Sequence, residues 1–190
     1  MTAAPALAPR ASAVCTAAEV SDEALALVID GEPGSKALVA RFTDAGLLAD
    51  AVKFLAHALP KRESVWWAWV CARKAAGGTP APRISTALAA TERWVVQPNE
   101  ENRRAAMAAA EQAEFGTPAG CAALAAFLSM GSVAPPHVQA VPPGEFASAK
   151  AVAGAVTLSA VAEPKQAEAK FREFIGLGLE VAERTKLWVA

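Results

Sequence analysis

The sequence predicts an all-α protein in which antiparallel helical hairpins pack as a compact or solenoid-like bundle of about eight or nine helices. Alanine has the highest helix propensity, and it makes up about a quarter of the 190 residues, far above its average share. Apolar residues recur every three or four positions along most of the chain. Strand signals are missing, since no segment alternates apolar and polar residues for long and the chain contains no tyrosine.

Capping signals divide the chain into helices. The first expected helix follows a capping box, Thr16 to Glu19, and its apolar residues reach Val28. Proline at a first helical position, as at Pro82, and glycine beyond a last one, as at Gly77, mark later boundaries. The remaining expected helices cover residues 35–46, 47–59, 61–76, 83–96, 99–115, 118–130, 146–162 and 164–186.

Composition divides the chain into four parts. Residues 1–14 are rich in alanine and proline, lack an apolar run of signal-peptide length, and are expected to form a flexible N-terminal arm. Residues 15–130 are expected to form the main helical bundle. Residues 131–145 hold four prolines and two glycines, which is typical of a Pro-rich linker. Residues 146–190 are expected to form a C-terminal helical pair that packs on the bundle.

Charge and cysteine content narrow the class of protein. The 18 basic and 19 acidic residues leave a net charge of −1, whereas nucleic-acid binding requires a basic excess, so we expect no nucleic-acid partner. No stretch has the length and apolarity of a membrane span, so no membrane insertion is expected. The three cysteines form no CxxC pair, which favours a reducing, cytoplasmic setting.

Motifs for catalysis and cofactor binding are absent from the sequence. It contains no phosphate-binding loop, no dinucleotide-binding glycine pattern, no nucleophile elbow and no HExxH pair. His57 and His137 each lack a second ligand three or four residues away, so no metal is expected. We therefore predict no catalytic residue and no cofactor, and the sequence favours a binding protein over an enzyme.

Three tryptophans fall within four residues of the expected helix 61–76. At 100° per residue, Trp67 lies 100° from Trp66 on one side and Trp69 lies 60° from it on the other. Either this helix is enclosed on all sides, or one tryptophan faces a partner, where tryptophan is enriched at interface hot spots. We expect Trp66 to be the buried core residue and one of Trp67 and Trp69 to be exposed.

Two hypotheses follow for a site. The first is a partner-binding surface in which Arg62 and Glu63 form a polar rim beside Trp67 and Trp69. The second is a Trp-lined pocket of a small enzyme or small-molecule binder, formed by His57, Arg62 and Trp66. A histidine just before a helix boundary more often bonds a backbone carbonyl, so the first hypothesis is preferred.

One block of the sequence is distinctive. The segment FLAHALPKRESVWWAWVCAR, with Trp94, PNEENRRAAMAAAE, FGTPAG and AVAGAV, resembles the bacterial family DUF6931 from about Val20 to Ala182. The LAHALPKRExVWWA block is specific, and the Ala-rich remainder is not. The resemblance implies a small cytoplasmic protein associated with type VI secretion neighbourhoods, and it transfers no catalytic residue. The expected function is a non-enzymatic adaptor or chaperone, accessory to bacterial protein secretion, whose partner is another protein.

Overall fold

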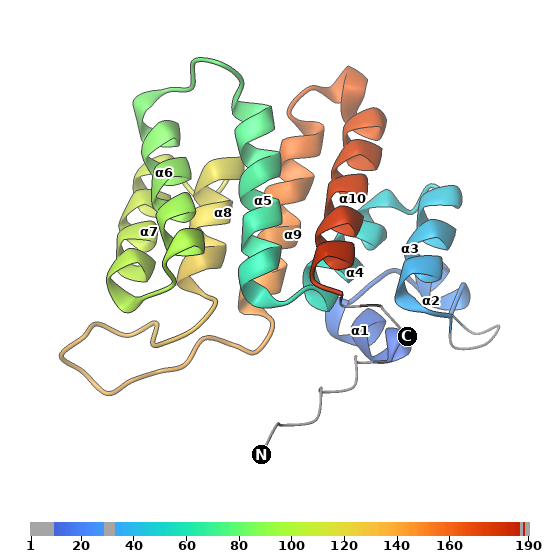
Figure 1. The fold of residues 1–190 in the computed structure, drawn as a ribbon, viewed down its shortest axis with the longest axis horizontal. Coiled ribbons are helices and arrows are strands. Elements are labelled where there is room, and N and C mark those ends of the chain that lie inside the picture. The colour runs from blue at the N-terminus through green and yellow to red at the C-terminus, as the bar shows by residue number, and fades with distance from the viewer. Residues whose placement is uncertain (1–9, 29–32, 187, 189–190) are drawn as a thin grey trace.

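The computed structural model of the protein describes residues 10–28, 33–186 and 188, and within them it is all-helical. The described residues form ten α-helices and one short 3-10 helix, and Figure 1 labels the α-helices. Their bounds are α1 (Ala11–Ala18), α2 (Asp22–Ala26), α3 (Ser35–Asp44), α4 (Leu48–Ala58), α5 (Lys61–Ala76), α6 (Pro82–Val96), α7 (Glu100–Ala113), α8 (Pro118–Phe127), α9 (Ala147–Val161), η1 (Pro164–Gln166) and α10 (Ala167–Arg184). The predicted fold class is confirmed.

The helices form a compact bundle with α5 near its centre. Helices α6, α5 and α10 lie side by side, and α8 and α9 pack behind α5 (Figure 1). Helix α9 contacts α8, α5, α4 and α10, so it lies between helices from both ends of the chain. The Pro-rich segment joins α8 and α9, which pack directly against each other.

Small residues allow α8 and α9 to approach closely. The buried residues of α8 are mainly alanine, and α9 contributes alanine, valine and Gly154. A Cβ atom at Gly154 would lie only 3.0 Å from the Cys121 sulfur, which in turn donates to the Ala151 carbonyl at 3.2 Å. Alanine therefore serves helix packing here as well as helix formation.

The N-terminal boundary differs from its prediction. Thr16 lies inside α1, and Glu19 ends that helix in a left-handed conformation with φ of 51°, so the predicted capping box is wrong. Ser21 caps α2 instead, its hydroxyl accepting from the Ala24 amide. Residues 11–14 form the first turn of α1 rather than a flexible arm, and residues 1–9 of that predicted arm lie outside the described residues.

Several later boundaries follow local signals more closely, whereas α2 ends at Ala26, before the expected Val28. Helix α5 has the predicted bounds, Gly46 adopts a positive φ of 77° after α3, and Thr117 caps α8 by accepting from the Gly120 amide. Helix α7 ends two residues early because Glu114 takes a positive φ of 68°. The described chain has ten α-helices rather than eight or nine mainly because α1 and α2 are separate helices.

Two arginines hold the start of the Pro-rich segment. The side chain of Arg103 is fully buried, pairs with Glu100 at 2.7 Å, and donates to the Phe127 and Ser132 carbonyls. Arg104 donates to the Ser132 and Ala134 carbonyls. Hydrogen bonds from both arginines to the Glu100 carboxylate lower its pKa to about 2, and the bonds to the carbonyls anchor the segment where it leaves α8.

Candidate functional site: the outer face of helix α5

Helix α5 has a buried face and an outer face. Its buried residues, Ser64, Val65, Trp67, Ala68, Cys71 and Ala72, pack against the rest of the bundle. Trp66, Trp69 and Val70 lie on the other side at spacings of three and four residues, and each is partly exposed. This outer face looks toward the viewer in Figure 1, between α6 and α10.

Trp67 belongs to the interior. Its side chain is fully buried, and its Nε1 donates to the Phe174 carbonyl of α10 at 2.8 Å. Gly178 makes room for the ring, since a Cβ atom there would lie 3.0 Å from it. Trp67 therefore lacks the exposed surface that the partner-binding hypothesis requires of it. Trp66, which the sequence predicts to be largely buried, packs against the core and keeps only part of its surface exposed.

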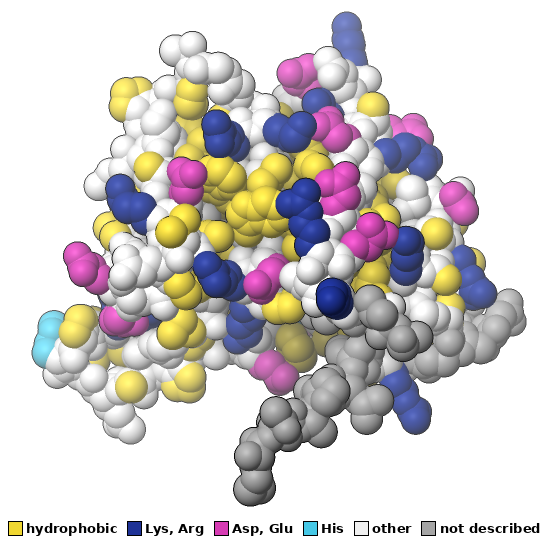
Figure 2. Space-filling view, in the orientation of Figure 1, with side chains coloured by type: hydrophobic (Ala, Val, Ile, Leu, Met, Phe, Trp, Pro, Cys, Tyr) yellow, Lys and Arg dark blue, Asp and Glu magenta, His cyan; other side chains and the backbone are white. Residues whose placement is uncertain are grey.

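A crevice lies on each side of the exposed tryptophans. Trp66 and Val70 border a narrow crevice against Leu177 of α10. Trp69 borders a wider one of about 490 Å³ against α6, where its Nε1 donates to the Leu88 carbonyl at 3.0 Å. Figure 2 shows the result as an apolar area in the middle of this face, surrounded by basic and acidic side chains.

Charged residues lie around the apolar centre. The Arg73 guanidinium lies 5.3 Å from the centre of the Trp69 ring, a cation–π distance. Glu92 borders the Trp69 crevice, while Glu180 and Arg184 border the Trp66 crevice. Both signs of charge are present, so the rim has no strong electrostatic bias.

Arg62 and Glu63 lie at the first turn of α5. Arg62 donates to the Val95 carbonyl at 2.7 Å and to the Val96 carbonyl at 3.3 Å, so it caps the last carbonyls of α6. Glu63 is partly buried. Both residues lie on the same helix as the exposed tryptophans, and Arg62 has a structural contact of its own.

His57 makes the expected backbone contact. Its Nδ1 lies 2.8 Å from the Lys53 carbonyl, which can only accept, so Nδ1 carries the proton. Its Nε2 is buried and has no hydrogen-bond partner within the described residues. Burial lowers the pKa of the His57 ring. The centre of this ring lies 5.6 Å from the centre of the Phe146 ring, and the two ring planes are tilted by 45°. His57 is therefore held in place by α4.

The three residues of the predicted Trp-lined pocket do not meet. His57 borders hollows between α4 and α9, Trp66 borders the crevice against α10, and Arg62 caps α6. The cysteines are equally unsuited to nucleophilic chemistry. Burial raises the pKa of Cys71 far above its usual range and that of Cys121 to about 11.

The described residues contain neither a cluster of metal ligands nor a membrane-spanning helix. No group of three or more histidine, cysteine or acidic side chains lies close enough to hold a metal ion. None of the helices in the described ranges has both the length and the apolarity needed to cross a bilayer.

The sequence profile of DUF6931, described as a family of unknown function, matches residues 38–182. The chain belongs to this family. The DUF6931 match begins within α3 and ends within α10, so it includes all of α5 and every residue that borders the two crevices except Arg184. No curated protein and no solved structure matches the chain.

The sequence of this DUF6931 protein contains a pattern that predicts which face of α5 is exposed. Arg62, Trp66, Trp69 and Arg73 are separated by four, three and four residues, which places them on one side of a helix. The small residues Ala68 and Ala72 mark the opposite side. Two arginines sharing a face with two tryptophans indicate the exposed side, because arginine is rarely buried.

Proposed function

We propose that this member of DUF6931 is a non-enzymatic, protein-binding adaptor or chaperone whose recognition surface is the outer face of α5. The observation that supports the proposal is the pair Trp66 and Trp69, which lie on this face, each partly exposed and each beside a crevice. A partner that covers both rings removes a large apolar area from water.

The composition of this face fits a protein partner. Interface hot spots are enriched in tryptophan and arginine and are surrounded by polar residues that exclude water. Here Trp66 and Trp69 form the centre, and Arg73, Glu92 and Glu180 lie around it. The matching partner is a segment that places an apolar side chain in the Trp69 crevice, covers the Trp66 ring, and carries charges of both signs outside them.

The alternative function, a small enzyme or small-molecule binder that uses His57, Arg62 and Trp66, has less support. Arg62 and Trp66 lie on the outer face of α5, whereas His57 borders hollows beside α4 and α9, so the three residues do not line one pocket. A substrate whose turnover is lost in His57→Ala would nevertheless favour this alternative over the adaptor.

We further propose a cytoplasmic setting in which the partner is a component or cargo of bacterial protein secretion. This part of the proposal rests on the family resemblance and on the charge and cysteine content. It predicts that capture from the native host enriches a secretion component.

The test is capture of partners from native-host lysate by immobilised protein, followed by mass spectrometry and measurement of affinity for the recovered partner. The double variant Trp66→Ala/Trp69→Ala is expected to weaken binding at least tenfold. Phe115→Ala removes an exposed aromatic ring outside this face and is expected to have no effect.

A charge-reversal variant distinguishes loss of binding from loss of folding. Arg73 is exposed, so Arg73→Glu should leave the fold intact while placing a carboxylate over Trp69. It is expected to weaken binding as well, with an unchanged circular dichroism spectrum. Equal binding by wild type and by both α5 variants would refute the proposed surface.

A further inference from the structure

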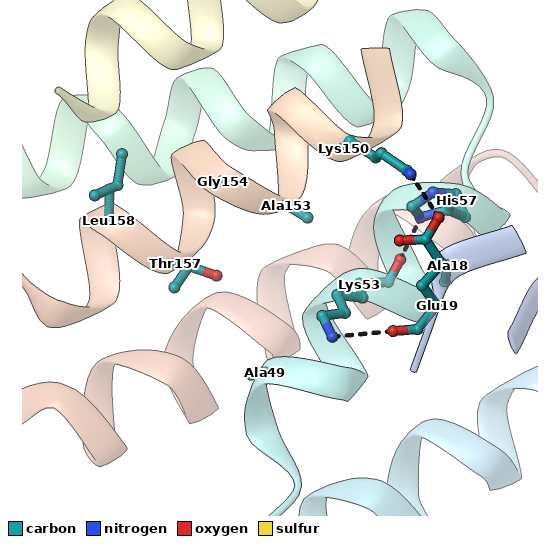
Figure 3. A pocket seen from close by; sticks show the side chains of 10 residues that line it. All are labelled: Ala18, Glu19, Ala49, Lys53, His57, Lys150, Ala153, Gly154, Thr157 and Leu158. Carbon is teal, nitrogen blue, oxygen red and sulfur yellow. Dashed lines mark hydrogen bonds and ion pairs between the residues drawn. The ribbon is translucent and has the colours of Figure 1, made fainter. Parts of the chain in front are cut away.

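A second hollow lies where the end of α1, helix α4 and helix α9 meet. Its volume is about 500 Å³, within the range of small-molecule pockets. Most of its lining is small and apolar, including Ala18, Ala49, Ala153 and Gly154, and Leu158 lies at one end (Figure 3). The described structure places no side chain of its own in the space.

The charged side chains gather at the opposite end of this pocket. Figure 3 shows Lys53, Lys150, His57 and Glu19 together, with Thr157 and Leu158 farther along α9. The Lys150 Nζ lies 2.7 Å from a carboxylate oxygen of Glu19, and the Lys53 Nζ donates to the Glu19 backbone carbonyl at 3.1 Å. The pocket is therefore amphipathic along its length.

The Glu19 carboxylate occupies the position beside Lys150 where the anionic group of a ligand would bind. Its carboxylate is 72% exposed, and its pKa is lowered mainly by the hydrogen bond from Lys150. Its backbone is in the left-handed region, with φ of 51°, which is unusual for a residue other than glycine. An exposed side chain at such a helix end can rotate away without disturbing the core.

The charge balance indicates a single negative charge on the ligand. Asp50 lies 3.4 Å from Lys53 and already accepts two hydrogen bonds from Ser21, so it stays in place. With the Glu19 carboxylate turned away, two ammonium groups face one remaining carboxylate. The net charge of +1 suits a monoanion.

We infer that this pocket binds a small amphipathic carboxylate, whose head group replaces the Glu19 side chain beside Lys150 and Lys53 and whose apolar body lies along α9. The rise from Lys150 to Leu158 is about 12 Å, a length suited to a medium-chain carboxylate. The site is separate from the outer face of α5, so this inference does not depend on the proposed protein partner.

Isothermal titration calorimetry with decanoate, below its micelle concentration, tests the inference. Wild type is expected to bind decanoate saturably and at least tenfold more tightly than decanol, which lacks the charge. Lys150→Gln is expected to weaken decanoate binding about fivefold. Glu19→Gln is expected to strengthen it, because the competing carboxylate is gone.

Two sets of matched controls make the result specific. Lys36 and Glu183 form an exposed ion pair elsewhere, so Lys36→Gln and Glu183→Gln should leave the affinity unchanged. Ala49 is exposed on the pocket wall, and Ala49→Phe should fill the space and reduce affinity at least tenfold. Ala108→Phe makes the same change at an exposed position of α7 and should have no effect.

Three results would overturn the inference. They are absence of saturable decanoate binding to wild type, equal affinity for decanol, and equal affinity of the Lys150→Gln, Glu19→Gln and wild-type proteins. The Trp66→Ala/Trp69→Ala variant should bind decanoate normally, which separates the failure of this site from the failure of the α5 surface.

Discussion

Trp66 and Trp67 are adjacent in sequence, yet Trp67 lies on the buried face of α5 and Trp66 on its outer face. Trp67 is enclosed by α4 and α10, and its indole nitrogen bonds a backbone carbonyl. Trp66 borders a crevice and keeps part of its surface exposed. The difference comes from the neighbours: helices cover one side of α5 completely, whereas α6 and α10 leave a strip of the other side uncovered.

The two faces therefore have different roles in the free energy of folding and of binding. A ring that is fully buried contributes to folding, and its removal leaves a cavity. A ring that is partly exposed in the isolated protein still has apolar area to lose when a partner covers it. Three measurements can challenge or refine this contrast.

The largest effect is expected for Trp67→Ala. We predict a loss of about 3–5 kcal/mol in the free energy of unfolding, because the change leaves a large cavity and removes the hydrogen bond to the Phe174 carbonyl. Urea denaturation followed by circular dichroism measures this loss.

Trp66→Ala is the matched control, since it deletes the same side chain one residue away. We expect it to cost less than Trp67→Ala, about 1–3 kcal/mol, because the Trp66 ring is partly exposed and its removal leaves an open groove rather than an enclosed cavity. Equal losses in the two variants would mean that both faces belong to the core, and the contrast would fail.

A smaller effect is expected at the glycines of α10 that flank this contact. A Cβ atom at Gly178 would lie 3.0 Å from the Trp67 ring and 3.1 Å from Leu55, both fully buried. We predict that Gly178→Ala lowers the free energy of unfolding by about 1–3 kcal/mol through overpacking.

Gly176→Ala makes the identical change two residues away. A Cβ atom at Gly176 has no neighbour within 4 Å in the described structure, so alanine should raise stability by about 0.5–1 kcal/mol through helix propensity. If Gly178→Ala destabilises the protein and Gly176→Ala stabilises it, the tight packing lies on the side of α10 that faces Trp67. Stabilisation by both variants would show that the interior can relax around Trp67.

The smallest expected effect on stability is the loss of an exposed ion pair of α5 as the pH falls. Lys74 of α5 pairs with Glu173 of α10 at 2.9 Å, and hydrogen bonds from Lys74 and Lys170 lower the pKa of Glu173. The stabilisation from a lowered carboxyl pKa is present above the usual value near 4.5 and is lost as the pH falls through the lowered one.

Thermal unfolding between pH 7 and pH 3 tests this contribution. Glu173→Gln should melt slightly below wild type at pH 7, and the difference should shrink as the pH falls below about 4.5. The effect should be small because both side chains are partly exposed. A difference that is constant with pH would show that the ion pair does not contribute.

Local signals were sufficient for most of the fold. The bounds of α5 follow from Pro60 and the Gly77–Gly78 pair, and Thr117 with Pro118 starts α8 as predicted. These signals act within one turn of helix, so no distant residue is needed to interpret them.

The N-terminus shows where local signals compete. Both Thr16 and Ser21 are good capping residues followed by acidic ones, and the sequence does not choose between them. Asp50 of α4 accepts hydrogen bonds from the backbone and hydroxyl of Ser21, which selects Ser21 as the cap. The separate α1 follows from a contact across 29 residues.

The candidate sites were harder to predict for the same reason. Helical spacing gives the angles between Trp66, Trp67 and Trp69, but not which of them points inward. That direction is decided by α10, which places Phe174 and Gly178 against Trp67 across more than a hundred residues. The charged end of the α4–α9 pocket likewise joins Glu19 to Lys150, 131 positions apart.

The helical class and most helix ends can therefore be derived from the order of residues alone, because capping and helical periodicity are short-range effects. The exposed face of α5 and the amphipathic pocket depend on which helices pack together. Burial and pairing of charges are long-range effects, since they depend on side chains that only the packed bundle brings into contact.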